Sequence, residues 1–213
     1  MIGELWQAFK GLPEEKLQQL QLQESASFKK IPPAEIPELI AKAVADGKNL
    51  AANVEQKFPG CSLAEILKAQ QVKVSFAELP ISEKFISLGA FELPNQITIN
   101  QSFQTKDAYF KKAGLSELLF ENWQQVAIAH ELFHFFAEPE ELFVKSYRLS
   151  LWSLGFYQHQ TSVGSLEEIA AMVFAKELLQ LDYYPYLLNL FLPAAFYPKE
   201  AEGRLTKLFK RIN

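Results

Sequence analysis

The sequence predicts an α+β fold that is mostly helical and carries a small three-stranded sheet. Apolar residues recur at helical spacing before residue 72 and after residue 106, whereas between residues 72 and 100 they alternate with polar residues, as in strands. No internal repeat or low-complexity run interrupts the 213 residues. We therefore expect one domain over residues 31–213, preceded by an N-terminal helical extension over residues 1–30.

Prolines mark the predicted extension and its boundary. Pro13 suits the first turn of a short helix in the extension, because proline lacks the N–H group that an opening turn leaves unpaired. Two prolines in residues 29–33 resist continuation of a helix. The domain is therefore predicted to begin after them.

Three helices are predicted in the first part of the domain. Residues 36–44 repeat at helical spacing, and Gly47 is expected to end that helix. A shorter helix is expected over residues 50–58. Ser62 and Glu65 have the spacing of a capping box and predict the start of the next helix.

The predicted sheet follows in three short segments. Apolar and polar residues alternate over residues 72–76, residues 85–93 form a second strand, and residues 97–99 a third. The Leu-Pro-Asn-Gln sequence at residues 93–96 is typical of a turn, so we expect the last two strands to form a hairpin.

The remainder of the chain, from about residue 106, is predicted to be mostly helical. Residues 121–138 form one long helix and residues 166–181 another. The aromatic stretch over residues 183–197 has two interpretations: core packing, which we favour, or a surface for a partner.

Composition excludes several classes of protein. The net charge is −4 and no basic face is evident, so direct nucleic-acid binding is not expected. Cys61 is the only cysteine, so no intrachain disulfide is possible. The first residues do not resemble a secretory signal, and no apolar run reaches the roughly 20 residues of a membrane helix. We therefore predict a cytoplasmic protein that does not contact a membrane.

One helix carries a pattern that predicts a metal site. In the sequence HELFH, His130 and His134 are four residues apart and lie on the same helical face. The surrounding residues are apolar, and buried imidazoles need partners. Zn²⁺ is such a partner, and Glu131, rotated by about 100°, can then serve as a general base. Two core histidines bonded to backbone are the simpler alternative.

A catalytic zinc site usually has three protein ligands. The remaining histidine, His159, lies in a polar stretch, and Ala137 and Glu140 do not fit the HExxHxxGxxH pattern. A carboxylate is therefore expected to complete the site. Glu167 and Glu168 both flank the apolar side of the predicted helix 166–181, and spacing alone does not distinguish them, nor does it exclude that they only start the helix.

Three segments resemble the ImmA/IrrE family of zinc metallopeptidases: FISLGAFELPNQITIN, VAIAHELFHFF and EIAAMVFAKELL. The last is similar to the family's E-x-x-A-x-x-F-A-x-x-L-L motif, and this resemblance selects Glu168 as the third ligand. It implies a minimal zincin-like domain, with the small sheet beside the HExxH helix. It also implies Zn²⁺ as the cofactor and a protein or peptide substrate, such as a helix-turn-helix repressor.

The expected reaction is peptide hydrolysis of the gluzincin type. Zinc would be bound by His130, His134 and Glu168, and Glu131 would accept a proton from water. An extended peptide is expected to pair with an edge of the hairpin over residues 85–100. Candidates for an oxyanion donor lie between the metal segments: Tyr147, Arg148, Tyr157 and His159. Two alternatives remain open: a binding or regulatory protein on a zincin scaffold without turnover, and a helical domain without metal.

Overall fold

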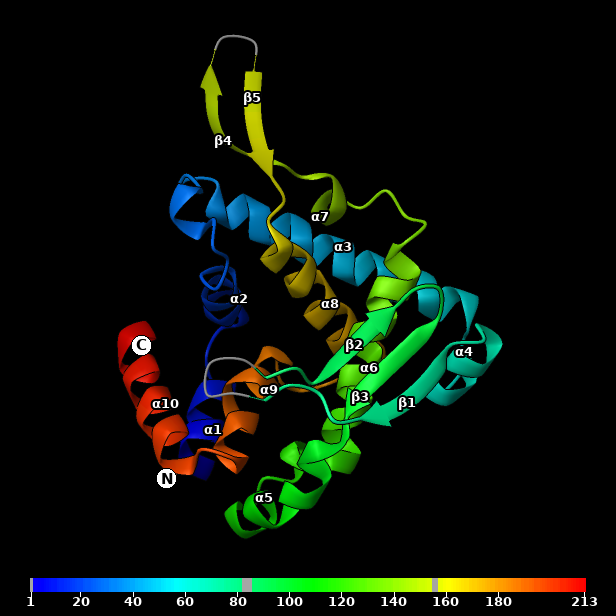
Figure 1. Ribbon diagram of the computed structural model, residues 1–213, viewed down its shortest axis with the longest axis vertical. Helices are drawn as coiled ribbons and strands as arrows, with labels where there is room; N and C mark the ends of the chain where they lie inside the picture. Colours follow the sequence, from blue (N-terminus) through cyan, green and yellow to red (C-terminus); the bar gives the residue numbers. More distant parts are fainter. Residues whose placement is uncertain (1, 82–85, 155–156) are drawn as a thin grey trace.

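The computed structural model describes residues 2–81, 86–154 and 157–213, and it confirms a mostly helical α+β fold with a three-stranded sheet (Figure 1). The described α-helices are α1 (Ile2–Lys10), α2 (Glu14–Leu22), α3 (Ile36–Lys57), α4 (Leu63–Ala69), α5 (Asp107–Ala113), α6 (Phe120–Ala137), α7 (Phe143–Ser146), α8 (Gly164–Leu179), α9 (Tyr186–Phe191) and α10 (Pro198–Ile212). The described strands are β1 (Lys73–Ala77), β2 (Gly89–Glu92), β3 (Gln96–Asn100), β4 (Leu149–Leu154) and β5 (Tyr157–Thr161). Short 3-10 helices cover Phe28–Lys30, Gln101–Lys106, Ser116–Leu118 and Leu192–Ala195.

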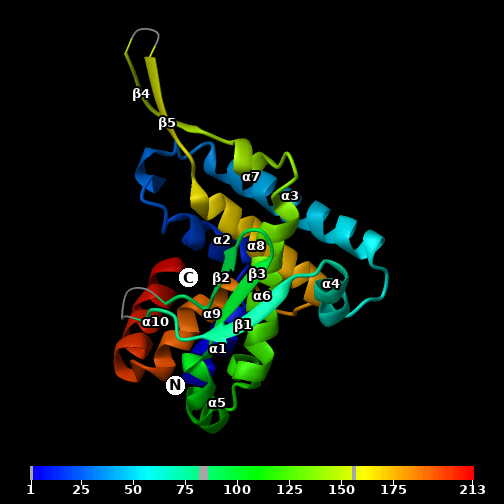
Figure 2. The same ribbon diagram turned by 45° about the vertical axis from the view of Figure 1, so that its right-hand side comes forward.

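The sheet has the order β1-β3-β2 and lies against α6 (Figure 2). As predicted, β2 and β3 form an antiparallel hairpin, and β1 pairs in parallel with β3. Ile97 and Ile99 of β3 are fully buried beneath the sheet, because alternate residues of a strand face the same side. The predicted second strand is shorter than expected, since β2 begins at Gly89; residue 85 lies outside the described residues.

Helices α3, α6 and α8 form the body that positions the site. α8 packs against both α3 and α6. The prediction that Gly47 ends a helix was wrong, because α3 runs without a break through it. A Cβ atom at Gly47 would lie 2.4 Å from the Ala170 carbonyl oxygen and 2.9 Å from Val173 Cβ. Glycine at this position therefore allows two helix backbones to approach closely, and packing outweighs its low helix propensity of about 1 kcal/mol.

The first thirty residues share the core with the C-terminal helices, and α1 lies beside α10 in both views (Figures 1 and 2). Trp6 and Phe9 are fully buried, and their rings lie 5.1 and 5.4 Å from the ring of Phe191 in α9. Edge-to-face pairs of this kind add to the free energy of burial. The boundary at residue 30 between an extension and a domain stays a prediction. The aromatic stretch over residues 183–197 contributes much of the core.

The hairpin of β4 and β5 was not predicted, because this region was expected to be helical. It projects from the body between α7 and α8 (Figure 1). Residues 149–151 alternate Leu, Ser and Leu, which is a period of two, but the run is too short to outweigh its helical surroundings. Among the described residues, no helix combines the length and the apolar character needed to span a membrane.

Candidate metal centre

Helix α6 presents His130 and His134 on one face. Most of its other side chains are buried, among them Val126, Ala129 and Leu132, so the helix is fixed on nearly every side. Because residues i and i+4 are neighbours on a helix, the two imidazole rings lie with their centroids 5.4 Å apart.

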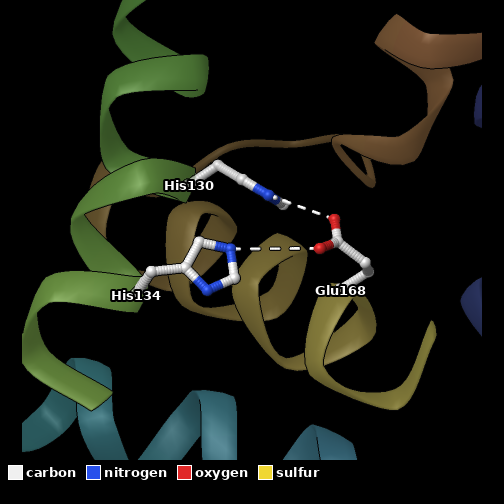
Figure 3. Close-up of side chains that lie close together, drawn as sticks. All are labelled: His130, His134 and Glu168. Carbon is white, nitrogen blue, oxygen red and sulfur yellow. Dashed lines mark ion pairs between the residues drawn. The ribbon is translucent and has the colours of Figure 1, made fainter. Parts of the chain in front are cut away.

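Helix α8 brings Glu168 to these two rings, as Figure 3 shows. One carboxylate oxygen lies 3.3 Å from His130 Nε2, and the other lies 3.9 Å from His134 Nε2. One ligand atom of each residue lies within 4.8 Å of those of the other two. Around a tetrahedral zinc ion, ligand atoms at about 2.0–2.1 Å from the metal are roughly 3.3 Å apart. The three side chains are therefore close enough to bind one ion with small adjustments.

The charges around His130 also fit a bound cation. Burial alone lowers the pKa of His130, but the hydrogen bond and negative charge of Glu168 raise it to about 9. Glu131 and Glu167 act in the same direction. Without metal, a proton on His130 therefore offsets the negative charge of the carboxylates, and a bound cation would take over that role. His130 Nδ1 is buried and has no hydrogen-bond partner among the described residues, so the protein alone does not satisfy this ring.

Glu167 lies beside the cluster and contacts a different atom. Its Oε1 is 3.1 Å from His134 Nδ1, on the other nitrogen of the ring from the one that faces Glu168. The two carboxylates that spacing left undistinguished are thus separated by the structure, and Glu168 is the one that faces both histidines.

Glu131 is 8% exposed and extends toward β2. A Cβ atom at Gly89 would lie 3.1 Å from Glu131 Cγ and Oε1, so the glycine makes room for the carboxylate. Burial raises the pKa of Glu131, although the charges of His130 and His134 and the backbone N–H of Phe91 oppose this.

A cavity of about 350 Å³ contains these four side chains. One part of its lining is polar and holds His130, Glu131, His134 and Glu168. The other part is mainly apolar and includes Ile86, Leu88, Val126, Met172, Pro185 and Leu188. Sequence reasoning missed these residues and the amide of Asn189, because α9 reaches the cavity only through the tertiary fold.

Asn100, at the end of β3, fixes the segment that borders this cavity. The residue is fully buried, and its amide group donates hydrogen bonds to the backbone carbonyls of Leu79 and Ser87. Its Oδ1 accepts from the N–H groups of Leu79 and Ser102. One side chain therefore joins the sheet to both ends of the loop that precedes β2.

The oxyanion candidates named from the sequence do not line the cavity in the described part of the chain. Arg148 donates to the backbone carbonyls of Lys145 and Tyr147. His159 is exposed on β5, and the β4–β5 hairpin projects away from α6, which carries the other two histidines (Figure 1). Tyr157 begins β5, and its side chain lies outside the described part of the structure.

The fold and the cluster define the chain as an α+β protein in which two histidines and a glutamate are placed to hold one metal ion. Comparison with protein families, with curated proteins and with solved structures finds no match. Evidence for a function therefore comes from the geometry of the cluster and from the sequence pattern that predicted it.

Proposed function

We propose that the chain is a zinc-dependent metallopeptidase with a minimal zincin-like domain. His130, His134 and Glu168 are the metal ligands, and Glu131 is the general base. The observation that carries the proposal is the convergence of three ligand atoms within 4.8 Å, with the Glu131 carboxylate lining the same cavity. Zn²⁺ bound there would polarise a scissile carbonyl and make water acidic enough to lose a proton near neutral pH.

Glu131 is suited to move that proton. Its pKa is raised by burial, which brings a carboxyl group closer to the pH at which it both accepts and returns a proton effectively. The carboxylate takes the proton from the attacking water and delivers it to the leaving amine.

The free edge of β2 offers a place for the peptide. Asn100 N–H donates to the Leu88 carbonyl, so the residues of β2 that bond to β3 alternate from Leu88. Gly89 and Phe91 consequently present their backbone groups to the opposite edge, beside Glu131. An extended substrate that pairs there would place a side chain against the apolar part of the cavity.

We propose a protein substrate of regulatory type, such as a helix-turn-helix repressor, following the resemblance to the ImmA/IrrE family. A cytoplasmic location belongs to the same proposal. The net charge of −4 gives no reason to expect a nucleic acid or an anionic membrane as a direct partner.

The proposal is tested first by metal content. Elemental analysis of protein purified without added metal or a histidine tag should give about one zinc per chain, and a His134→Ala variant should lose it. Hydrolysis of a peptide library, read by mass spectrometry, should then depend on the metal. Absence of stoichiometric metal after zinc is supplied would overturn the proposal.

One observation favours a second candidate, a binding or regulatory protein without turnover on the same scaffold. Glu131 packs closely against Gly89, where a Cβ atom would lie 3.1 Å from its Cγ and Oε1, and this packing is a structural role that needs no catalysis. Zinc-loaded protein that captures a peptide without cutting it would support this candidate, whereas cleavage that is lost in Glu131→Gln would exclude it.

A further inference from the structure

We infer that Glu167 is a positioning residue that orients His134 as a metal ligand. This inference rests on the proposed metal centre and assigns a role to a carboxylate outside the ligand set. Glu167 lies in the first turn of α8, immediately before Glu168, and its Oε1 is 3.1 Å from His134 Nδ1.

The hydrogen bond fixes the tautomer of His134. An ionised carboxylate only accepts hydrogen bonds, so Nδ1 of His134 must carry the proton and donate it. In a neutral imidazole the lone pair then lies on Nε2. That atom is the one that faces Glu168, at 3.9 Å, so the lone pair points into the cluster.

Glu167 and Glu168 are adjacent on α8 but contact different atoms of the two histidines. Consecutive helical residues are rotated by about 100°, which directs their side chains differently. Glu168 extends to the side of the cluster that faces both Nε2 atoms, while Glu167 reaches the far nitrogen of His134. A glutamate in a first turn is also favoured by the helix dipole, but that preference does not require contact with the ring.

The two histidines differ in this respect. His130 Nδ1 is buried and finds no hydrogen-bond partner in residues 2–81, 86–154 and 157–213, so its ring is oriented by packing and by Glu168. His134 Nδ1, by contrast, is bonded to Glu167 before any metal arrives. Loss of the Glu167 contact would leave neither imidazole with an oriented Nδ1. Outer partners of metal-bound histidines typically contribute about 10–100-fold to metal affinity.

The experiment compares Zn²⁺ and Co²⁺ binding in four proteins: wild type, Glu167→Ala, Glu167→Gln and Glu177→Ala. Glutamine retains an oxygen that accepts from Nδ1 without the charge. Glu177 is a matched control on the same helix, where it lies 3.9 Å from Lys48 and outside the cluster. Affinity is measured by competition with a chromophoric chelator, and ligand geometry by the visible absorption band of bound Co²⁺.

We expect Glu167→Ala to bind zinc about 10–100-fold more weakly and to shift the cobalt band. Glu167→Gln should keep the wild-type band and recover most of the affinity, and Glu177→Ala should match wild type. Wild-type affinity and spectrum in Glu167→Ala would overturn this role and leave the metal centre intact. Equal losses of zinc affinity in Glu167→Ala and Glu167→Gln would also overturn it, because the charge of Glu167 rather than its orienting bond to His134 would then account for the affinity. Wild-type protein that binds neither ion would overturn the metal centre itself, and this role with it.

Discussion

Glu131 is the residue whose environment most directly connects the cluster to a reaction. Its side chain is 8% exposed, packs against Gly89 and lines the cavity that contains the candidate ligands. Glutamine has nearly the same shape, but it has no basic oxygen to take a proton. Replacing Glu131 by glutamine therefore tests proton transfer while nearly keeping the shape of the side chain.

We predict that Glu131→Gln keeps about one zinc per chain and loses peptide hydrolysis by about 10²–10⁴-fold. The measurements are elemental analysis and the initial rate on a cleaved peptide. Glu121→Gln, in the exposed first turn of the same helix, is the control and should behave as wild type. Wild-type turnover in Glu131→Gln would contradict the general-base role.

The raised pKa of His130 predicts proton release on metal binding. With a pKa of about 9, metal-free His130 is protonated at pH 7, and zinc binds only neutral imidazole. Each zinc bound at pH 7 should therefore release about one proton, and apparent affinity should rise by up to about tenfold per pH unit between pH 7 and 9. Calorimetry in buffers of different ionisation enthalpy measures the release, with zinc binding by a simple chelator as calibration. Stoichiometric binding without proton release would contradict the assignment.

For individual residues, the sequence predicted the two histidines and Glu131 because their spacing on a helix is local information. Helical spacing narrowed the proposed third ligand to Glu167 or Glu168, and only the family resemblance selected Glu168, since the choice depends on how α8 lies against α6. Gly89 and Asn189 at the cavity carried no signal that single-sequence reasoning recognises, because their positions are set by elements distant in the chain.

The close contact between helices α3 and α8 depends on Gly47, which has no side chain. Gly47 in α3 lets the Ala170 carbonyl of α8 approach to a distance that no Cβ atom tolerates. α8 also carries Glu168, so this contact bears on the position of the proposed metal ligand.

We predict that Gly47→Ala destabilises the protein by about 1–3 kcal/mol, although alanine favours a helix by about 1 kcal/mol. Zinc affinity should fall with it, since a displaced α8 moves Glu168. Gly203→Ala is the matched control: Gly203 lies in α10, and a Cβ atom there would meet nothing within 4 Å. That variant should gain about 0.5–1 kcal/mol. Urea unfolding measures the stability of both variants. Unchanged stability in Gly47→Ala would contradict the conclusion that the contact between α3 and α8 requires glycine at this position.

The elements that the sequence predicted well have strong local signals. Helix α4 has both hydrogen bonds of the predicted capping box, between Ser62 and Glu65, and α6 and α8 lie within two residues of their predicted bounds. The failures have nonlocal causes. Gly47 resembles a helix terminus until the packing of α8 is known, and the β4–β5 hairpin contains only a brief alternation in a helical context.

For the whole molecule, long-range contacts join the two ends of the chain. Lys10 of α1 forms ion pairs with Glu117 and Asp182, and Trp6 donates a hydrogen bond to Glu117. Aromatic residues in the sequence indicated a large core, but which of them meet was not predictable, because pairs such as Trp6 with Phe191 and Phe9 with Phe209 are far apart in the chain. The candidate site lies on α6 and α8, whose buried residues belong to this core, so its ionisation affects the stability of the whole protein.

The metal-free protein should lose stability as pH rises from 6.5 to 9. The pKa of His130 is about 9 in the folded state against 6.5 for an ordinary histidine, so the folded state binds more protons in this interval. The stabilisation is fully present below pH 6.5 and is lost as pH passes through 9, by about 3 kcal/mol. The raised pKa of Glu131 acts in the same direction, while the lowered pKa of Glu168 matters only in acid.

Zinc should reverse this trend, because its affinity increases as the competing proton leaves. Urea unfolding at pH 6.5, 7.5 and 9, with either a chelator or excess zinc, measures both effects. The stabilisation by zinc should increase with pH, and a metal-free His130→Gln variant should show a flatter profile than wild type. If metal-free wild type instead kept constant stability from pH 6.5 to 9, the carboxylates would not hold a proton on His130. The carboxylates would then give this cluster no electrostatic preference for a bound cation.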